Sequence, residues 1–295
     1  MNGILCVNKP EGFTSFDVIA KMRGITGVRK MGHAGTLDPM ATGVLLLLLG
    51  RATKACDILP DETKRYTAGF RFGLTTDTQD VTGTVLSESG KVVEKETLCG
   101  ILSDFKGDIK QVPPMYSAVH VNGQRLYDLA RQGREVEREP RLIHIFELEL
   151  LNYDEEIRSG LLDVRCSKGT YIRTLVHDVG QRLGAGGVLT SLVRTESSGF
   201  TLEKCITLEE AQELSAAGMI GERLIPVETV FQNCPVIRLS AVQKRMFLNG
   251  VRLDLNRIRH RDEPGLHSVY GPERDFLGVA RLDFEKMELR VVSFF

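Results

Sequence analysis

One segment constrains the fold of this chain more than any other: the loop sequence Gly32–Gly43, which is followed at once by the apolar run Val44–Leu49. An uninterrupted apolar run of this length suits a strand that is buried on both faces. The glycines before it allow positive φ angles or a close backbone approach, and Pro39 stiffens the turn. The pattern predicts one carboxylate, Asp38, in a tight loop fixed against a buried strand. On local composition alone, an ordinary turn between two core elements is an equally good interpretation.

The composition fits a folded chain with one large domain or a large and a small one, because 42% of its 295 residues are hydrophobic and 26% are charged. The net charge of −1 argues against a protein that coats nucleic acid indiscriminately. Positive charge is nonetheless clustered: residues 9–54 hold seven Lys and Arg against three acidic residues, and residues 244–261 hold six against one. Each cluster alone is typical of a solvated surface. Together they permit a phosphate-binding surface without proving one.

Cysteine spacing, the N-terminus and the apolar runs all point to a reduced, soluble, cytoplasmic protein. None of the six cysteines forms a C-x-x-C pair or a zinc-type cluster with histidine. The first residues have no signal-peptide character, and the longest apolar run is far too short to span a membrane. The sequence also lacks a phosphate-binding Walker loop and a dinucleotide-binding glycine motif. We therefore expect no metal, no cofactor and no membrane partner.

The patterns beyond the loop predict several elements that carry polar residues. Thr14 and Asp17 are spaced to cap a helix, and an alternating strand spans residues 64–73. A tight turn is indicated at Asn122-Gly123, and an amphipathic helix spans residues 172–183. Five short strand candidates lie between residues 236 and 292, as in a small β-rich domain.

Four further blocks accompany the Gly32–Gly43 loop, and each is ambiguous by itself. They are N-K-P-E-G-F-T-S from Asn8, K-R-Y-T-A through T-D-T-Q-D from Lys64, P-P-M-Y-S-A from Pro113, and C-S-K-G-T-Y-I-R-T-L from Cys166. Taken alone, a turn lysine is usually exposed, a strand tyrosine usually packs in the core, and an arginine at a helix start usually lies on the surface.

Taken in order, these blocks resemble the TruB family of tRNA pseudouridine synthases, strongly from Asn8 to about Phe200 and weakly beyond Val236. The resemblance implies an α+β fold with a mixed, largely antiparallel sheet and flanking helices. It implies a catalytic domain over residues 1–229, with an RNA-gripping insertion at about 111–141. A small, β-rich, PUA-like RNA-binding domain would occupy residues 230–295.

The resemblance also implies roles for individual residues. Asp38 would be the catalytic nucleophile, and Arg173 would pair with it and hold the carboxylate ionised. Tyr66 would stack on a base that has left the RNA helix and take part in proton transfer. The implied substrate contacts are Lys9 in the active-site wall, His33 in the space left by the flipped base, Tyr171 at the start of its helix, and Leu192 in the uridine pocket.

The implied activity is conversion of the T-loop uridine at position 55 of tRNA to pseudouridine, by a monomer that grips the T-arm. The sequence leaves the chemical route open: Asp38 would attack the ribose, attack the base, or assist a glycal intermediate. Two rival classes remain. One is a non-catalytic RNA-binding or RNA-folding protein on the same scaffold, and the other is a hydrolase, which would need a second catalytic carboxylate.

Overall fold

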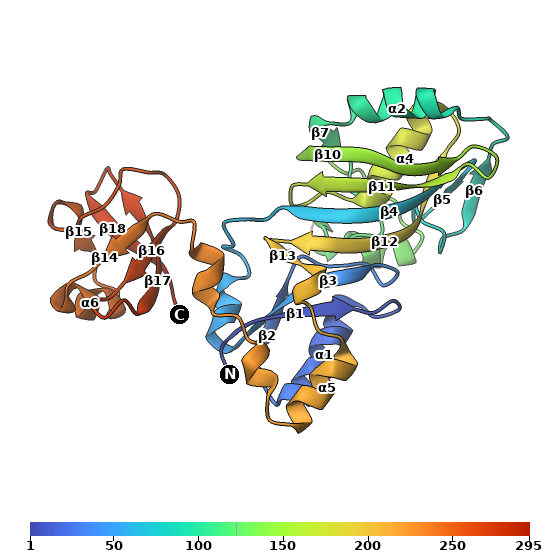
Figure 1. The fold of residues 1–295 in the computed structure, drawn as a ribbon. Coiled ribbons are helices and arrows are strands. Elements are labelled where there is room, and N and C mark those ends of the chain that lie inside the picture. Colours follow the sequence, from blue (N-terminus) through green and yellow to red (C-terminus); the bar gives the residue numbers. More distant parts are fainter. Residues whose placement is uncertain (122) are drawn as a thin grey trace.

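A mixed sheet, nine-stranded within the described residues, forms the larger part of the molecule (Figure 1). The computed structural model describes residues 1–121 and 123–295, so the turn residue Asn122 lies outside it. The main path through the sheet is β1 (Gly3–Lys9), β3 (Thr42–Leu49), β12 (Gly187–Ser197), β4 (Lys64–Phe72), β11 (Ser159–Cys166), β10 (Arg141–Asp154) and β7 (Gly107–Gln111). Strand β2 (Met31–Ala34) pairs with β3, and β13 (Phe200–Thr201) pairs with β12. Among these described pairings only β12 with β3 is parallel, which confirms the predicted α+β fold with a largely antiparallel sheet.

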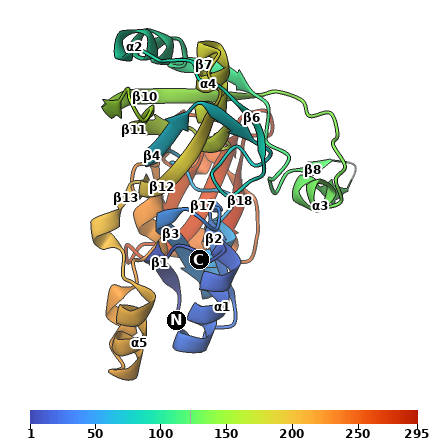
Figure 2. The same ribbon diagram turned by 90° about the vertical axis from the view of Figure 1, so that its right-hand side faces the viewer.

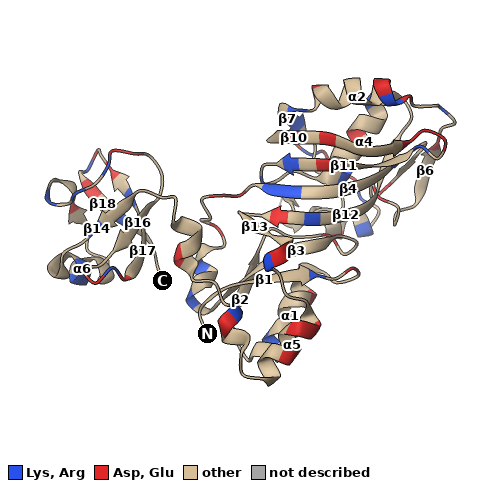
Figure 3. Ribbon diagram, viewed as in Figure 1, with Lys and Arg blue, Asp and Glu red and all other residues tan. Residues whose placement is uncertain are grey.

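Two helices cover one face of this sheet. Helix α4 (Ile172–Leu183) packs on β12 and β4, and α2 (Lys95–Asp104) packs on α4 and β10. Tyr66, Phe70 and Phe72 of β4 point into the core beneath them. The alternate residues face the other way, where Arg65 of β4 pairs with Asp163 of β11 at 2.8 Å. Figure 3 shows where Lys and Arg (blue) and Asp and Glu (red) fall along β4, β11 and β12.

The apolar run after the loop lies in β3 and is buried on both sides, as predicted. Leu45, Leu47 and Leu49 pack toward α1 (Ser15–Thr26) and α5 (Leu208–Ala216). The alternate residues Val44, Leu46 and Leu48 pack into a separate cluster with residues of the C-terminal part of the chain. Helix α1 begins at the predicted capping box, in which the Thr14 and Asp17 side chains each bond the other residue's backbone.

A second sheet, five-stranded within the described residues, lies at the opposite end of the molecule in Figure 1. Its order is β14 (Val236–Arg238), β16 (His267–Tyr270), β17 (Phe276–Asp283), β18 (Glu288–Phe294) and β15 (Leu253–Asp254). Helix α6 (Ala241–Leu248) packs into its core through Phe247. Short 3-10 helices complete the chain: η1 (Gly50–Ala55), η2 (Leu202–Lys204), η3 (Ile220–Arg223), η4 (Val227–Phe231) and η5 (Leu255–Arg257).

The segment predicted as an insertion stands away from the main sheet (Figure 2). It contains β8 (His120–Val121), β9 (Gln124–Arg125) and α3 (Leu126–Arg131). A second small hairpin, β5 (Leu74–Thr76) with β6 (Val85–Glu88), follows β4. Within the part of the chain that the structure describes, no helix is long and apolar enough to cross a membrane.

Candidate functional site

The loop between β2 and β3 holds Asp38 in place through its backbone. Leu37 is buried, and its N–H donates to the Ser15 hydroxyl at 2.9 Å. On the other side of Asp38, the Pro39 carbonyl accepts from the N–H of Gly12 at 2.9 Å. The carboxylate is thus carried on a fixed loop whose neighbouring residues are tied to the start of α1 and to the turn before it.

Lys9 supports the same loop from behind. Its side chain is fully buried, and Nζ donates to the carbonyls of Pro10 at 2.9 Å, Phe13 at 2.5 Å and Pro39 at 3.2 Å. Burial lowers the pKa of Lys9 to about 8, although the nearby charge of Asp38 acts in the opposite direction. The ammonium group therefore holds backbone carbonyls beside Asp38 and is not among the residues that line the two cavities described below.

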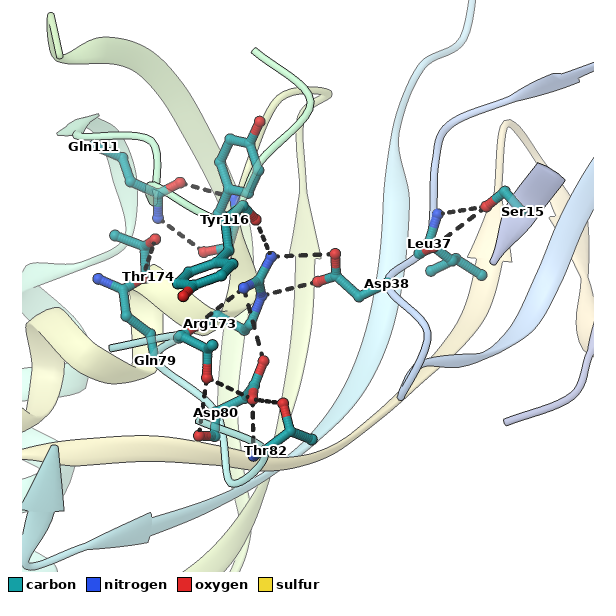
Figure 4. Close-up of polar contacts among 12 residues, drawn as sticks. Ser15, Leu37, Asp38, Gln79, Asp80, Thr82, Gln111, Tyr116, Arg173 and Thr174 are labelled. Carbon is teal, nitrogen blue, oxygen red and sulfur yellow. Dashed lines mark hydrogen bonds and ion pairs between the residues drawn. The ribbon is translucent and has the colours of Figure 1, made fainter. Parts of the chain in front are cut away.

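Arg173, in the first turn of α4, meets Asp38 with two parallel contacts (Figure 4). Nε lies 2.9 Å from Oδ2, and Nη2 donates to Oδ1 at 3.1 Å. The Arg173 side chain is 5% exposed, whereas that of Asp38 is 36% exposed. This bidentate geometry is the strong form of an arginine–carboxylate contact, and it fixes the orientation of a carboxylate that solvent or a ligand still reaches.

The rest of the Arg173 guanidinium is also satisfied. Nη1 donates to the Thr78 carbonyl and Nη2 to the Tyr116 carbonyl, both at 2.9 Å. The carboxylate of Asp80 lies behind it, with Oδ2 3.7 Å from Nη1. Arg173 thus sits between two carboxylates, one accessible and one buried (Figure 4).

Asp80 is itself fixed by a threonine-rich turn. Its Oδ1 accepts from the Thr78 hydroxyl at 2.8 Å, and from the Thr82 hydroxyl and backbone N–H at 2.6 and 2.9 Å. The side chain is only 6% exposed. Sequence reasoning included Asp80 in the T-D-T-Q-D block but gave it no role. The sequence signal for a buried Asp80 was its position between Thr78 and Thr82, whose hydroxyls can donate hydrogen bonds to a carboxylate.

Two cavities meet at Asp38 and Arg173, which line both. The smaller, of about 220 Å³, also contains Tyr66, Tyr171 and Leu192. The larger, of about 790 Å³, also contains His33 and extends to the inserted segment. The structure therefore brings together all the predicted site residues except Lys9, which lies behind the loop.

Tyr66 forms part of the smaller cavity from the middle of the sheet. On β4 it lies between Val164 of β11 and Arg194 of β12. It is almost fully buried, and burial raises the pKa of its hydroxyl to about 12. At neutral pH the phenol is protonated, as it is in an ordinary tyrosine, and the raised pKa makes it a weaker acid.

Tyr171 and Leu192 complete this cavity. The side-chain amide of Gln111 clamps the Tyr171 backbone, because Nε2 donates to its carbonyl at 3.0 Å and Oε1 accepts from its N–H at 2.8 Å. Leu192 lies on β12 opposite Ala68 of β4. The cavity thus combines two aromatic rings and several apolar side chains with the Asp38 carboxylate and two cations, Lys64 and Arg173.

His33 and the inserted segment line the larger cavity. Burial lowers the pKa of His33, which keeps its imidazole neutral. In the insertion, the rings of Tyr116 and Tyr127 meet edge-on, with their centroids 6.2 Å apart. The guanidinium carbon of Arg131 lies over the Tyr127 ring, 4.5 Å from its centroid. Among the described residues, no group of three or more His, Cys, Asp or Glu side chains is arranged to hold a metal.

Comparison with protein families defines the class to which this fold and site belong. Residues 23–172 match the TruB family pseudouridylate synthase N-terminal domain, and residues 173–232 match the tRNA pseudouridylate synthase B C-terminal domain. The chain belongs to the TruB family of pseudouridylate synthases, which are isomerases.

Individual relatives are similar over nearly the whole chain. The tRNA pseudouridine synthase B of Syntrophomonas wolfei is 43% identical over 287 residues, 95% of this chain and 93% of its own length. That of Dehalococcoides mccartyi is 41% identical over 280 residues, 95% and 92% of the two chains.

Solved structures share the fold at lower identity. A chain from an H/ACA RNP bound to a substrate RNA containing 2′-deoxyuridine has a TM-score of 0.75 and 22% identity, covering 99% of this chain and 84% of its own. A chain from a Cbf5-Nop10-Gar1 complex has a TM-score of 0.75 and 24% identity, covering 98% and 83%.

Proposed function

We propose that this protein isomerises the uridine at position 55, in the T-loop of tRNA, to pseudouridine, with Asp38 as the nucleophile. The observation that carries the proposal is the contact between Arg173 and Asp38. A buried guanidinium makes two contacts to an accessible carboxylate and fixes its orientation where two cavities meet. Relatives about 40% identical carry the name tRNA pseudouridine synthase B, which supports tRNA as the substrate.

The smaller cavity is suited to a single nucleobase that has left the RNA stack. Tyr66 stacks on the flipped base, and its hydroxyl takes part in proton transfer during the rearrangement. Tyr171 and Leu192 hold the base from the sides. His33, neutral and facing the larger cavity, fills the space that the base leaves in the RNA.

Lys9, the remaining residue of the predicted site, acts through the loop. It is fully buried and bonds the carbonyl of Pro39, next to the nucleophile. It therefore positions Asp38 and makes no direct contact with RNA.

The remaining parts of the chain provide RNA contacts. We assign residues 1–229 to the catalytic domain and residues 230–295 to a PUA-like RNA-binding domain. The insertion at about 111–141 grips the T-arm, because its Tyr127 and Arg131 line the cavity that opens beside Asp38. The protein acts in the cytoplasm as a monomer, without a metal or cofactor.

The geometry weighs against a hydrolase. Such an enzyme needs a second carboxylate that is free to act as acid or base. Asp80 is the nearby carboxylate, but it is buried and its oxygens are committed to Thr78, Thr82 and Arg173.

Tritium release tests the proposal. tRNA transcribed with [5-³H]uridine loses tritium to water when C5 of the target forms its new bond to the ribose. We expect release from wild-type tRNA and none from a tRNA whose T-loop target is cytidine. Release that survives this replacement would refute the assigned position, and tight binding of tRNA without release would favour a non-catalytic RNA-binding protein.

A further inference from the structure

Two cations that the proposed mechanism does not use lie in the sheet next to the smaller cavity, and one of them, Lys64, lines it. Lys64 and Tyr66 project from the same face of β4, and Lys64 lines the cavity together with Gly35 and Leu192. Arg194, on β12, lies directly opposite Tyr66. Lys64 therefore lines the cavity from the sheet, and Arg194 is buried in the sheet beside it, whereas Asp38 is carried on the loop.

Arg194 is a fully buried guanidinium with spare hydrogen-bonding capacity. Its Nε donates to the Val44 carbonyl at 2.7 Å and its Nη2 to the Gly35 carbonyl at 2.9 Å. Its Nη1 is buried and has no hydrogen-bond partner among the described residues. This nitrogen lies beside Gly35, 3.2 Å from where a Cβ on that residue would stand.

Neither cation is neutralised by a carboxylate within the described part of the chain. Lys64 Nζ donates to the backbone carbonyl of Glu62 at 3.2 Å, whereas the Glu62 carboxylate pairs with Lys168. Arg194 forms no ion pair among the described residues; it bonds two carbonyl oxygens and acts on the Tyr66 hydroxyl opposite it, whose pKa it lowers. Burying an uncompensated charge is costly, so a pair of such cations beside a cavity indicates an anionic or strongly polar ligand.

We propose that Lys64 is a further catalytic residue, which donates a hydrogen bond to a carbonyl oxygen of the flipped uracil, and that the buried charge of Arg194 reinforces it. This inference rests on the proposed function. When the C1′–N1 bond breaks, its electron pair moves to N1 and is shared by the two carbonyl oxygens. The C1′–C5 bond then forms, the proton on C5 is lost and N1 gains one, so no co-reactant is needed. A fixed cation near those oxygens favours the cleaved state over the intact nucleoside.

The surroundings of Lys64 keep this role sensitive to pH. Burial and the charge of Arg194 lower the pKa of Lys64, whereas Cys166 on β11 and Glu62 raise it, and Lys168 adds a smaller lowering effect. An ammonium is the donor that the proposal needs, so activity that depends on Lys64 is lost as pH rises through its pKa. An arginine at the same position stays charged throughout that range.

The rate of single-turnover isomerisation of tRNA by Lys64→Met tests the assignment. Methionine removes the charge while keeping a side chain of similar length. We expect the rate to fall by about 100-fold, as when a single transition-state donor is removed, while the tRNA dissociation constant and melting temperature stay close to wild type. Lys95→Met is the matched control, because Lys95 is exposed at the start of α2 and should change nothing. A wild-type rate for Lys64→Met, in a preparation whose wild type is active, would overturn this inference alone.

The pH profile separates a catalytic from a purely structural role. Lys64→Arg should retain much of the rate, and its activity should persist to higher pH than that of the wild type. Identical alkaline limbs for the two proteins would overturn the proposal. An inactive wild type on every tRNA tested would instead overturn the proposed function, and this inference with it.

Discussion

Asp80 lies on the opposite side of Arg173 from Asp38, with its Oδ2 3.7 Å from Arg173 Nη1. The arginine is therefore held between a buried carboxylate and an accessible one (Figure 4). The buried carboxylate compensates the charge of Arg173 from behind, which helps keep the guanidinium aligned with Asp38.

Asp80→Asn tests this arrangement. The amide keeps the size of the side chain but removes the charge behind Arg173. We expect turnover to fall by about 10-fold to 100-fold, the range seen when a residue that orients a functional group is lost. Tritium release at saturating tRNA measures it. Asp104→Asn, whose carboxylate is exposed on α2, is the control, and equal activity of the two variants would contradict the account.

Arg173→Lys tests the two-pronged contact itself. Lysine keeps the charge but loses the planar fork that meets both oxygens of Asp38 and the carbonyls of Thr78 and Tyr116. We expect a loss of about 100-fold or more in the single-turnover rate. Near-normal turnover by this variant would show that the bidentate geometry is not required.

Tyr66→Phe separates stacking from proton transfer. Phenylalanine preserves the ring but removes the hydroxyl, whose pKa burial raises to about 12. We expect tRNA affinity to be retained and the single-turnover rate to fall by about 100-fold, as for loss of a general acid or base. Binding is measured by filter retention and the rate by tritium release. A variant as fast as wild type would limit Tyr66 to stacking.

Lys9 should make stability depend on pH in the alkaline range. Its pKa is about 8 in the folded chain and 10.5 as an ordinary lysine. Between these values the unfolded chain binds more protons than the folded one, so the free energy of unfolding contributed by Lys9 rises with pH. Below pH 8 both forms are protonated and the contribution is constant.

The measurement compares wild type with Lys9→Met by urea unfolding at several pH values. Taking the difference between the two proteins removes the other titrating groups. Wild type should gain up to about 3 kcal/mol relative to the variant as pH rises from 8 to 10.5. If the free energies of unfolding of the two proteins change in parallel with pH, burial does not lower the pKa of Lys9.

Short sequence patterns predict those elements of the fold that depend on neighbouring residues in the chain. The apolar run Val44–Leu49 predicts a strand buried on both faces, and β3 is one. The spacing of Thr14 and Asp17 predicts the cap of α1. Helix α6 was not predicted, although Ser240 and Gln243 form a capping box before it. The apolar residues of α6 form only a weak helical pattern in the sequence. The helix is stabilised by the packing of Phe247 in the core of the second sheet.

The site depends on contacts that no local pattern encodes. Asp38 and Arg173 are 135 residues apart, and only the family resemblance joined them in advance. The buried carboxylate of Asp80 and the unpaired nitrogen of Arg194 become evident only when β12 packs beside β4 and the threonine turn closes over Arg173. Similarly, the sequence places Lys9 beside a Pro/Gly turn, where a lysine is usually exposed, and nothing in that pattern indicates that Lys9 is fully buried.

Tritium release by Asp38→Asn tests the central claim most directly. Asparagine keeps the size of the side chain and can still accept a hydrogen bond from Arg173, but it is not a nucleophile. The account predicts a variant that folds and binds tRNA like the wild type, yet releases no tritium from [5-³H]uridine tRNA above background. Turnover by Asp38→Asn at the wild-type rate would contradict the assignment of Asp38 as the nucleophile.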